Sequence, residues 1–161
     1  MTSADPNLSF TARGGWWVAL QVPVLIGAAA VPVVAGSGAL WPQQWLQGLG
    51  VAIAVLGVAL TAAGLMSLGN ALTPFPRPRS NASLRTNGVY ARVRHPIYGG
   101  LVVASLGWAL WWLSAWGVAY VVLVFIFFDR KATREEVWLR AKFPGYIEYR
   151  HRARKLIPLI Y

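Results

Sequence analysis

The chain of 161 residues has no cysteine and only five acidic residues, and charged residues of either sign make up 12% of it. The absence of cysteine excludes a disulfide framework, a thiolate metal site and a cysteine nucleophile. Soluble domains contain about 25% charged and about 45–50% apolar residues, whereas 57% of this chain is hydrophobic. That composition excludes intrinsic disorder and argues against a soluble globular protein. The 15 Lys and Arg leave a net charge of +10, which requires an anionic partner.

Charge is missing altogether from two long stretches. No Asp, Glu, Lys or Arg occurs between Arg13 and Arg77, or between Arg94 and Asp129. Apolar stretches of about 18 or more residues are typical of membrane-spanning helices. We therefore predict an integral, multi-pass membrane protein. This placement favours anionic membrane lipid over nucleic acid as the partner of the basic residues.

The first uncharged stretch divides into two predicted spans, at 16–35 and 45–68. The interval between them is polar and turn-forming, and its tryptophan suits the headgroup level. Within the second span, Gly50, Gly57 and Gly64 recur at intervals of seven residues. Small residues let membrane helices approach closely, so this spacing favours a packing seam over a ligand contact.

The second uncharged stretch, 97–128, would form a helix about 48 Å long, which is too long for one span and short for two. Its flanks at 77–94 and 129–161 are both basic, so both should lie on the cytoplasmic side. Flanks on the same side require an even number of crossings. We therefore predict a helical hairpin that turns near 112–115.

The predicted fold is a single all-α integral membrane domain, residues 1–161, with four transmembrane helices. The last two helices form the hairpin, a cytoplasmic loop covers 72–96, and a cytoplasmic helical tail covers 129–161. Both termini are then cytoplasmic, and we expect a plasma membrane of bacterial type. The sequence leaves the oligomeric state open.

Polar chemistry is concentrated in two cytoplasmic segments, and the first ends at the start of the third helix. Proline is favoured at the first helical position, so Pro96 makes His95 the cap residue. The free N–H groups of that helix start form an anion site, and Arg94 stands just before it. Gly99 and Gly100 would let a ligand approach the backbone. The alternative is an interfacial helix start whose arginines meet anionic lipid.

The second segment contains adjacent carboxylates, Glu135 and Glu136, in a tail that is otherwise rich in cations. They could hold a cationic amine or accept hydrogen bonds from ribose hydroxyls. The alternative is surface ion pairing, because Glu136 precedes Arg140 by four residues.

A helical face follows the Pro144-Gly145 break. Tyr146, Tyr149 and Arg150 share that face and could line a polar pocket. They could equally extend to the membrane interface from apolar stems.

The two segments together resemble the isoprenylcysteine carboxyl methyltransferase and phospholipid N-methyltransferase group of integral membrane methyltransferases. The resemblance covers about residues 72–158. Its motifs are Gly88-Val89-Tyr90-x-x-Val93-Arg94-His95-Pro96-x-Tyr98-x-Gly100, then Glu135-Glu136, Phe143, Tyr146, Tyr149 and Ile157-Pro158. Two positions depart from the pattern: Tyr146 follows Phe143 by three residues rather than four, and Lys155 replaces the more usual arginine.

The resemblance implies an enzyme that binds S-adenosylmethionine at the cytoplasmic face, releases S-adenosylhomocysteine and methylates a membrane-embedded amphiphile, a lipid or lipidated small molecule. It implies no metal. The implied cofactor residues are Val89, Tyr90, Arg94, His95, Tyr98, Gly100, Glu135 and Glu136. The implied substrate residues are Tyr146, Tyr149 and Arg150, and the catalytic ones are Arg150, Glu136 and His95.

Carboxyl O-methylation and amine N-methylation both remain open. A carboxylate is already ionised at pH 7, whereas an amine would lose a proton to His95 or a glutamate. One rival is a membrane sterol or steroid reductase that uses NADPH, but such enzymes tend to carry a glutamate where this chain has Leu101. The other rival is a non-catalytic adaptor whose basic tail binds anionic lipid.

Overall fold

The computed structural model describes residues 9–36, 44–69, 72–78 and 82–161. Within these ranges the regular secondary structure is helical, joined by irregular segments, with one isolated parallel bridge between Val93 and Arg154. The helices are α1 (Gly15–Val34), α2 (Gln44–Leu68), the 3-10 turn η2 (Gly88–Ala91), α3 (Pro96–Trp111), α4 (Ala115–Lys142) and α5 (Tyr146–Arg152). The all-α class predicted from the sequence is confirmed. The middle of the interval expected between the first two spans lies outside the described residues.

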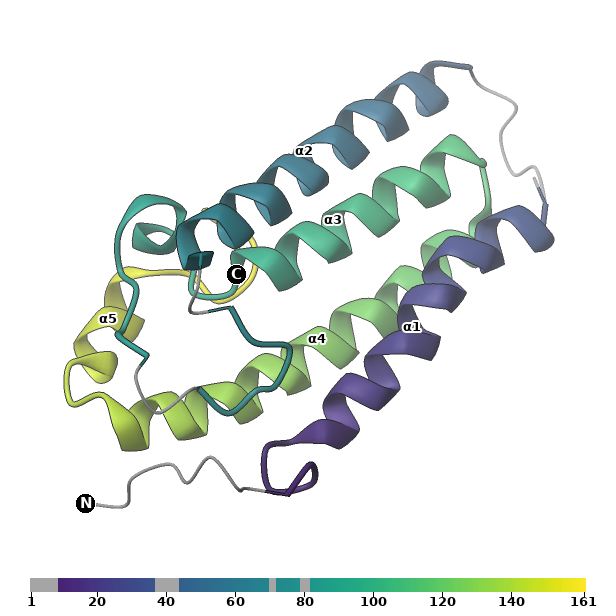
Figure 1. Cartoon of the computed structure of the whole chain (residues 1–161). Coiled ribbons are helices and arrows are strands. Elements are labelled where there is room, and N and C mark those ends of the chain that lie inside the picture. The colour runs from purple at the N-terminus through teal and green to yellow at the C-terminus, as the bar shows by residue number, and fades with distance from the viewer. Residues whose placement is uncertain (1–8, 37–43, 70–71, 79–81) are drawn as a thin grey trace.

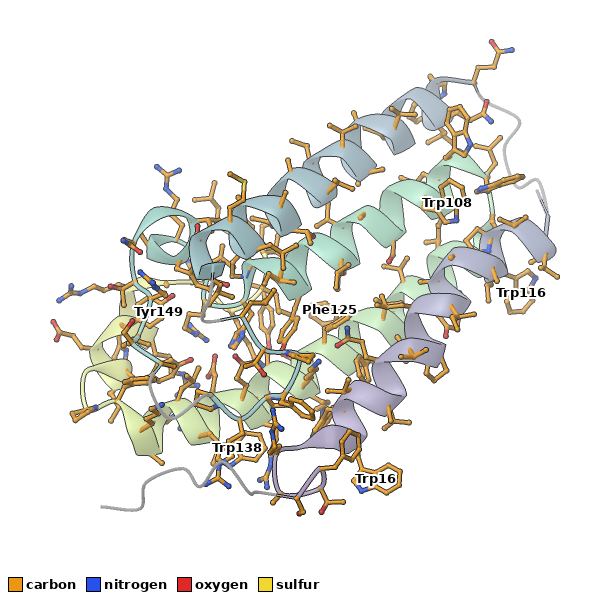
Figure 2. The ribbon with its side chains drawn as sticks, viewed as in Figure 1. Trp16, Trp108, Trp116, Phe125, Trp138 and Tyr149 are labelled. Carbon is orange, nitrogen blue, oxygen red and sulfur yellow. The ribbon has the colours of Figure 1, made fainter. Side chains whose placement is uncertain are left out.

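Helices α1 and α2 have the length and composition of membrane spans. They contain 20 and 25 residues without an acid or a base, and most of their large apolar side chains are exposed rather than packed inside. Figure 2 places exposed Trp16 and Trp116 at opposite ends of the bundle, as aromatic belts at two membrane interfaces require. Among the described helices only these two are both long enough and apolar enough to cross a membrane, because α3 has 16 residues and α4 carries charge in its second half.

The predicted glycine seam of the second span joins α2 to α3. Gly50, Gly57 and Gly64 are the buried residues of α2. A methyl group added to Gly57 would lie 2.3 Å from the backbone nitrogen of Ala104. Only glycine therefore allows the two backbones to pack this closely.

The hairpin between α3 and α4 turns at residues 112–114, within the interval expected from the sequence. Leu113 has a positive φ of 48°, and the Ser114 hydroxyl accepts from the backbone N–H of Gly117 at 3.1 Å to cap α4. Helix α4 then runs on for 28 residues, through the charged sequence up to Lys142. One continuous helix therefore joins the apolar bundle to the polar end of the molecule.

The polar segments gather at one end of the bundle. Figure 1 shows α5, η2, the connection after α2 and the C-terminus together at the end where α2 finishes and α3 begins. Helices α1 and α2 lie on opposite sides, with α3 and α4 between them. This arrangement brings segments that are far apart in the sequence together at the polar end.

Candidate functional site

His95 is held at the start of α3 by the C-terminal segment. Its backbone N–H donates to the carbonyl of Lys155 at 3.0 Å, and that of Arg94 donates to the carbonyl of Arg154 at 2.8 Å. Pro96 is the first residue of α3 and His95 is its N-cap, as predicted, although the imidazole makes no cap hydrogen bond. His95 is 5% exposed. Because its ring makes no cap hydrogen bond, the ring is free to contact α4.

Two glutamates of α4 flank the His95 ring. Glu136 Oε1 accepts from Arg94 Nε at 2.9 Å and lies 3.3 Å from His95 Nε2. Glu135 Oε2 accepts from the Tyr98 hydroxyl at 2.9 Å and lies 3.9 Å from His95 Nδ1. The rings of His95 and Tyr98 stack with their centroids 5.6 Å apart. The structure thus joins the two motif segments in one polar cluster.

The two carboxylates differ in their electrostatics. Burial alone would raise the pKa of Glu136, but the His95 hydrogen bond and the Arg94 guanidinium lower that pKa to about 2. For Glu135, burial dominates and raises the pKa, although His95 and the Tyr98 hydroxyl oppose it. Glu136 is therefore firmly ionised. Burial disfavours the charged form of Glu135, which a cationic ligand would stabilise. The predicted Glu136–Arg140 pair forms at 3.7 Å, longer than the Arg94 contact.

A cavity of about 300 Å³ lies beside the cluster. Ligand pockets start at about this size and combine apolar walls with a few placed polar groups. Tyr90, Arg94, His95, Tyr98, Lys131 and Glu135 supply the principal polar groups. The apolar walls come from α2, the connection after it, α3 and α4, and include Leu65, Leu68, Leu72, Leu84, Leu101, Leu139 and Phe143.

Two tyrosines of α5 close this cavity. The Tyr149 hydroxyl donates to the backbone carbonyl of Tyr90 at 2.6 Å and ties α5 to η2. Figure 2 shows Tyr149 at this polar end, away from Trp108 and Trp116. Tyr146 is 1% exposed, and its hydroxyl has no hydrogen-bond partner in the described part of the chain. An unmade buried hydrogen bond costs about 1–3 kcal/mol, so this hydroxyl is available to a ligand.

The glycines at the start of α3, Gly99 and Gly100, pack closely against neighbouring segments. A methyl group on Gly99 would overlap the carbonyl of Leu156, and one on Gly100 would lie 2.3 Å from the hydroxyl of Thr61. The C-terminal segment and α2 therefore fill the space that we expected a ligand to use. Gly100 packs against α2 and does not line the cavity.

Three other predicted residues, Val89, Arg150 and Glu136, do not line this cavity either. Val89 is half-buried but contributes no part of its lining. Arg150, with a side chain 48% exposed, lies 3.6 Å from Glu136 Oε2 and lines a second cavity of about 490 Å³. Glu136 lines that second cavity as well, and separates Arg150 from His95.

The sequence interpretation missed Lys131 and Gln21. Lys131 Nζ donates to Gln21 Oε1 and, at 3.3 Å, to the carbonyl of Pro74, and both side chains line the first cavity. Two signals were present: Gln21 is the only amide side chain in an otherwise apolar span, and Lys131 precedes Glu135 by one helical turn.

The polar cluster lies in a part of the chain that matches a known protein family. The family model described as phospholipid methyltransferase matches residues 45–145, from α2 through both glutamates. The chain is a member of the phospholipid methyltransferase family. The matched range includes the His95, Tyr98 and glutamate cluster, and this confirms the suspected family and its class of activity, methyl transfer in a membrane.

Relatives and a solved structure give the same result. Protein-S-isoprenylcysteine O-methyltransferase B of Arabidopsis thaliana is 28% identical over 149 residues, which are 89% of this chain and 73% of that protein. The Mus musculus protein-S-isoprenylcysteine O-methyltransferase is 30% identical over 128 residues, covering 74% of this chain and 45% of the relative. The structure of the eukaryotic intramembrane Ras methyltransferase ICMT matches 97% of this chain with a TM-score of 0.68 and 25% identity. The chain spans 54% of that enzyme.

Proposed function

We propose that this member of the phospholipid methyltransferase family transfers a methyl group from S-adenosylmethionine to the polar end of a lipid or lipidated substrate at the cytoplasmic face of the membrane. The observation that carries the proposal is the cluster of His95, Tyr98, Glu135 and Glu136, of which His95, Tyr98 and Glu135 line a cavity with apolar walls. The relatives named as isoprenylcysteine O-methyltransferases support a lipidated acceptor.

The cavity suits the cofactor in its charge and in the chemistry of its walls. S-Adenosylmethionine supplies an electrophilic methyl group on a positively charged sulfur. Glu135, whose charge burial disfavours, would stabilise a cationic ligand. The unpartnered hydroxyl of Tyr146 offers a donor inside the cavity. Leu139 and Phe143 provide an apolar wall for a heterocyclic ring.

The reaction is an in-line displacement. A bond forms between the acceptor oxygen or nitrogen and the methyl carbon while the carbon–sulfur bond breaks, and that bonding pair stays on sulfur. The protein contributes by holding the reactants in line, which contributes several kcal/mol, and by excluding water. An ionised carboxylate needs no base, whereas an amine would pass its proton to His95 or Glu135.

The proposed topology has four crossings with both termini cytoplasmic. Helices α1 and α2 are the long apolar spans, and the α3–α4 hairpin supplies two shorter ones. The end of the molecule that holds α5 and η2 in Figure 1 then faces the cytoplasm, as the basic segments 77–94 and 129–161 require. A lipid tail would reach the cavity from the bilayer, past the leucines of α2 that line it.

Calorimetry with S-adenosylhomocysteine on protein in nanodiscs tests the proposal. We expect saturable binding, weakened about tenfold or more by Glu135→Gln, because a charge-assisted hydrogen bond is worth about 1.5–3 kcal/mol. Glu148→Gln is the matched control, since Glu148 is exposed and pairs with Arg152 on the surface of α5. Absence of binding at millimolar ligand contradicts the proposal, and saturable binding of NADPH instead supports the reductase.

A further inference from the structure

Lys131 is a buried cation that has no ion pair in the described part of the chain. The residue is 1% exposed, and its ammonium donates to two neutral oxygens, Gln21 Oε1 and the Pro74 carbonyl. No carboxylate of the described residues lies within ion-pair distance of it, and it stands 5.2 Å over the Tyr98 ring. A buried charge is costly unless it is paired, so the sequence keeps a positive charge here at a cost to stability.

The hydrogen bonds of Lys131 do not themselves require that charge, which the cation–π contact with the Tyr98 ring uses. Holding a side-chain amide and a backbone carbonyl takes hydrogen-bond donors, which a neutral side chain can also supply. An ammonium has three donors, and the two neutral oxygens occupy two of them. The third N–H of the ammonium is therefore left over, and Lys131 lines the cavity.

The other cations near the cluster are accounted for. Arg94 is paired with Glu136 at 2.9 Å. Arg150 lies in the second cavity. Arg85, on the connection before η2, lines the first cavity but is exposed. Lys131 is therefore the buried cation of the first cavity whose charge no described carboxylate pairs.

Lys131 also lies at the membrane-facing end of the cluster. It precedes Glu135 by one turn, about 6 Å along α4 toward the hairpin turn, and its partner Gln21 belongs to the apolar helix α1. A ligand group beside Lys131 would come from the bilayer side. The glutamates and His95 lie deeper toward the cytoplasmic segments.

We propose that Lys131 is a specificity-determining residue whose free N–H binds an anionic oxygen of the acceptor, so that the site selects a carboxylate-bearing lipid over its neutral or amine counterpart. This inference rests on the proposed function. Between the apolar walls of the cavity the ammonium attracts a carboxylate and repels a protonated amine. It replaces Arg150 as the group that orients the acceptor.

Binding in nanodiscs without cofactor tests the role of Lys131. The probes are N-acetyl-S-farnesylcysteine, which carries a free carboxylate, and its neutral amide. We expect the wild-type protein to bind the carboxylate about tenfold more tightly, as one charge-assisted hydrogen bond gives. Lys131→Met should reduce this preference to about twofold or less, and Lys131→Arg should restore most of it. Arg130→Met, at the adjacent exposed position of α4, should leave it unchanged.

Each outcome decides for or against the role. An unchanged preference in Lys131→Met overturns it, and so does weaker binding of S-adenosylhomocysteine with the preference intact. If Lys131→Met does not fold, the pH dependence of the wild-type preference decides. Burial, opposed by Glu135, lowers the pKa of Lys131 to about 8, and the side chains facing it are Glu135, Gln21 and Tyr98. The preference should disappear between about pH 7 and pH 9.5, and a constant preference contradicts the proposal.

This experiment is independent of turnover. If the protein binds the carboxylate selectively through Lys131 but binds no S-adenosylhomocysteine, the proposed function fails and the assignment of Lys131 stands. If the cofactor product binds but the carboxylate preference does not depend on Lys131, only the assignment fails.

Discussion

Replacing Glu136 by glutamine removes the negative charge on which the site is organised. Glu136 is 2% exposed, and its oxygens face Arg94, His95 and Arg150. Folding lowers its pKa from 4.5 to about 2, which corresponds to about 3 kcal/mol of stability at neutral pH. Leaving the buried Arg94 guanidinium without its partner gives a similar figure, about 3–5 kcal/mol.

Thermal unfolding in detergent micelles measures this loss. For a chain of this size 1 kcal/mol corresponds to about 2–4 °C in Tm, so Glu136→Gln should lower Tm by about 6–12 °C at pH 7. Because folding lowers the pKa, the contribution of Glu136 is complete above pH 4.5 and is lost as pH falls from 4.5 toward 2. The difference in Tm between wild type and variant should therefore shrink across that window.

The control is Glu148→Gln, which breaks an exposed i, i+4 pair on α5 and should leave Tm unchanged. A Glu136→Gln protein that melts at the wild-type temperature at pH 7 would refute the reasoning. So would a Tm difference that stays constant down to pH 2.

Three further predictions concern the seam, the pocket and the topology. Gly57→Ala should destabilise the protein in thermal unfolding by about 1–3 kcal/mol, because the added methyl group meets the backbone of α3. The control is Gly48→Ala, whose added methyl group meets nothing within 4 Å and should be neutral or stabilising. Equal effects of the two substitutions would refute the close packing of α2 against α3. Tyr146→Phe should leave Tm unchanged or raise it, because the Tyr146 hydroxyl has no described hydrogen-bond partner. The same substitution should weaken S-adenosylhomocysteine binding about fivefold. An unchanged affinity in calorimetry would show that the hydroxyl does not contact this ligand. Since the chain lacks cysteine, a single cysteine introduced at Gln44 or at Arg152 reports topology in intact cells. A membrane-impermeant maleimide should label the cysteine at position 44 and not the one at position 152. The reverse pattern would overturn the proposed orientation.

The charge pattern of the sequence predicted the helices well, because membrane spans depend on long uncharged runs that are visible residue by residue. The turn at 112–114 and the seam of Gly50, Gly57 and Gly64 follow from such local patterns. The meeting of His95 with the glutamate pair was predicted through the family resemblance rather than through spacing.

Other features could not be predicted from local pattern. Lys131 reaches the cavity only because α1 packs against α4 and brings Gln21 alongside it, a contact between residues far apart in the chain. Gly99 and Gly100 suggested room for a ligand, but the C-terminal segment and α2 fill that room. A glycine permits a close approach without specifying which partner approaches.

Methyl transfer itself can be measured with protein in nanodiscs, S-adenosylmethionine labelled in its methyl group and N-acetyl-S-farnesylcysteine as acceptor. We predict saturable incorporation of label into a base-labile methyl ester, which Glu135→Gln lowers at least tenfold and Glu148→Gln leaves unchanged. No incorporation into this acceptor or into an amine-bearing phospholipid, by protein shown to be folded, would contradict the proposed activity.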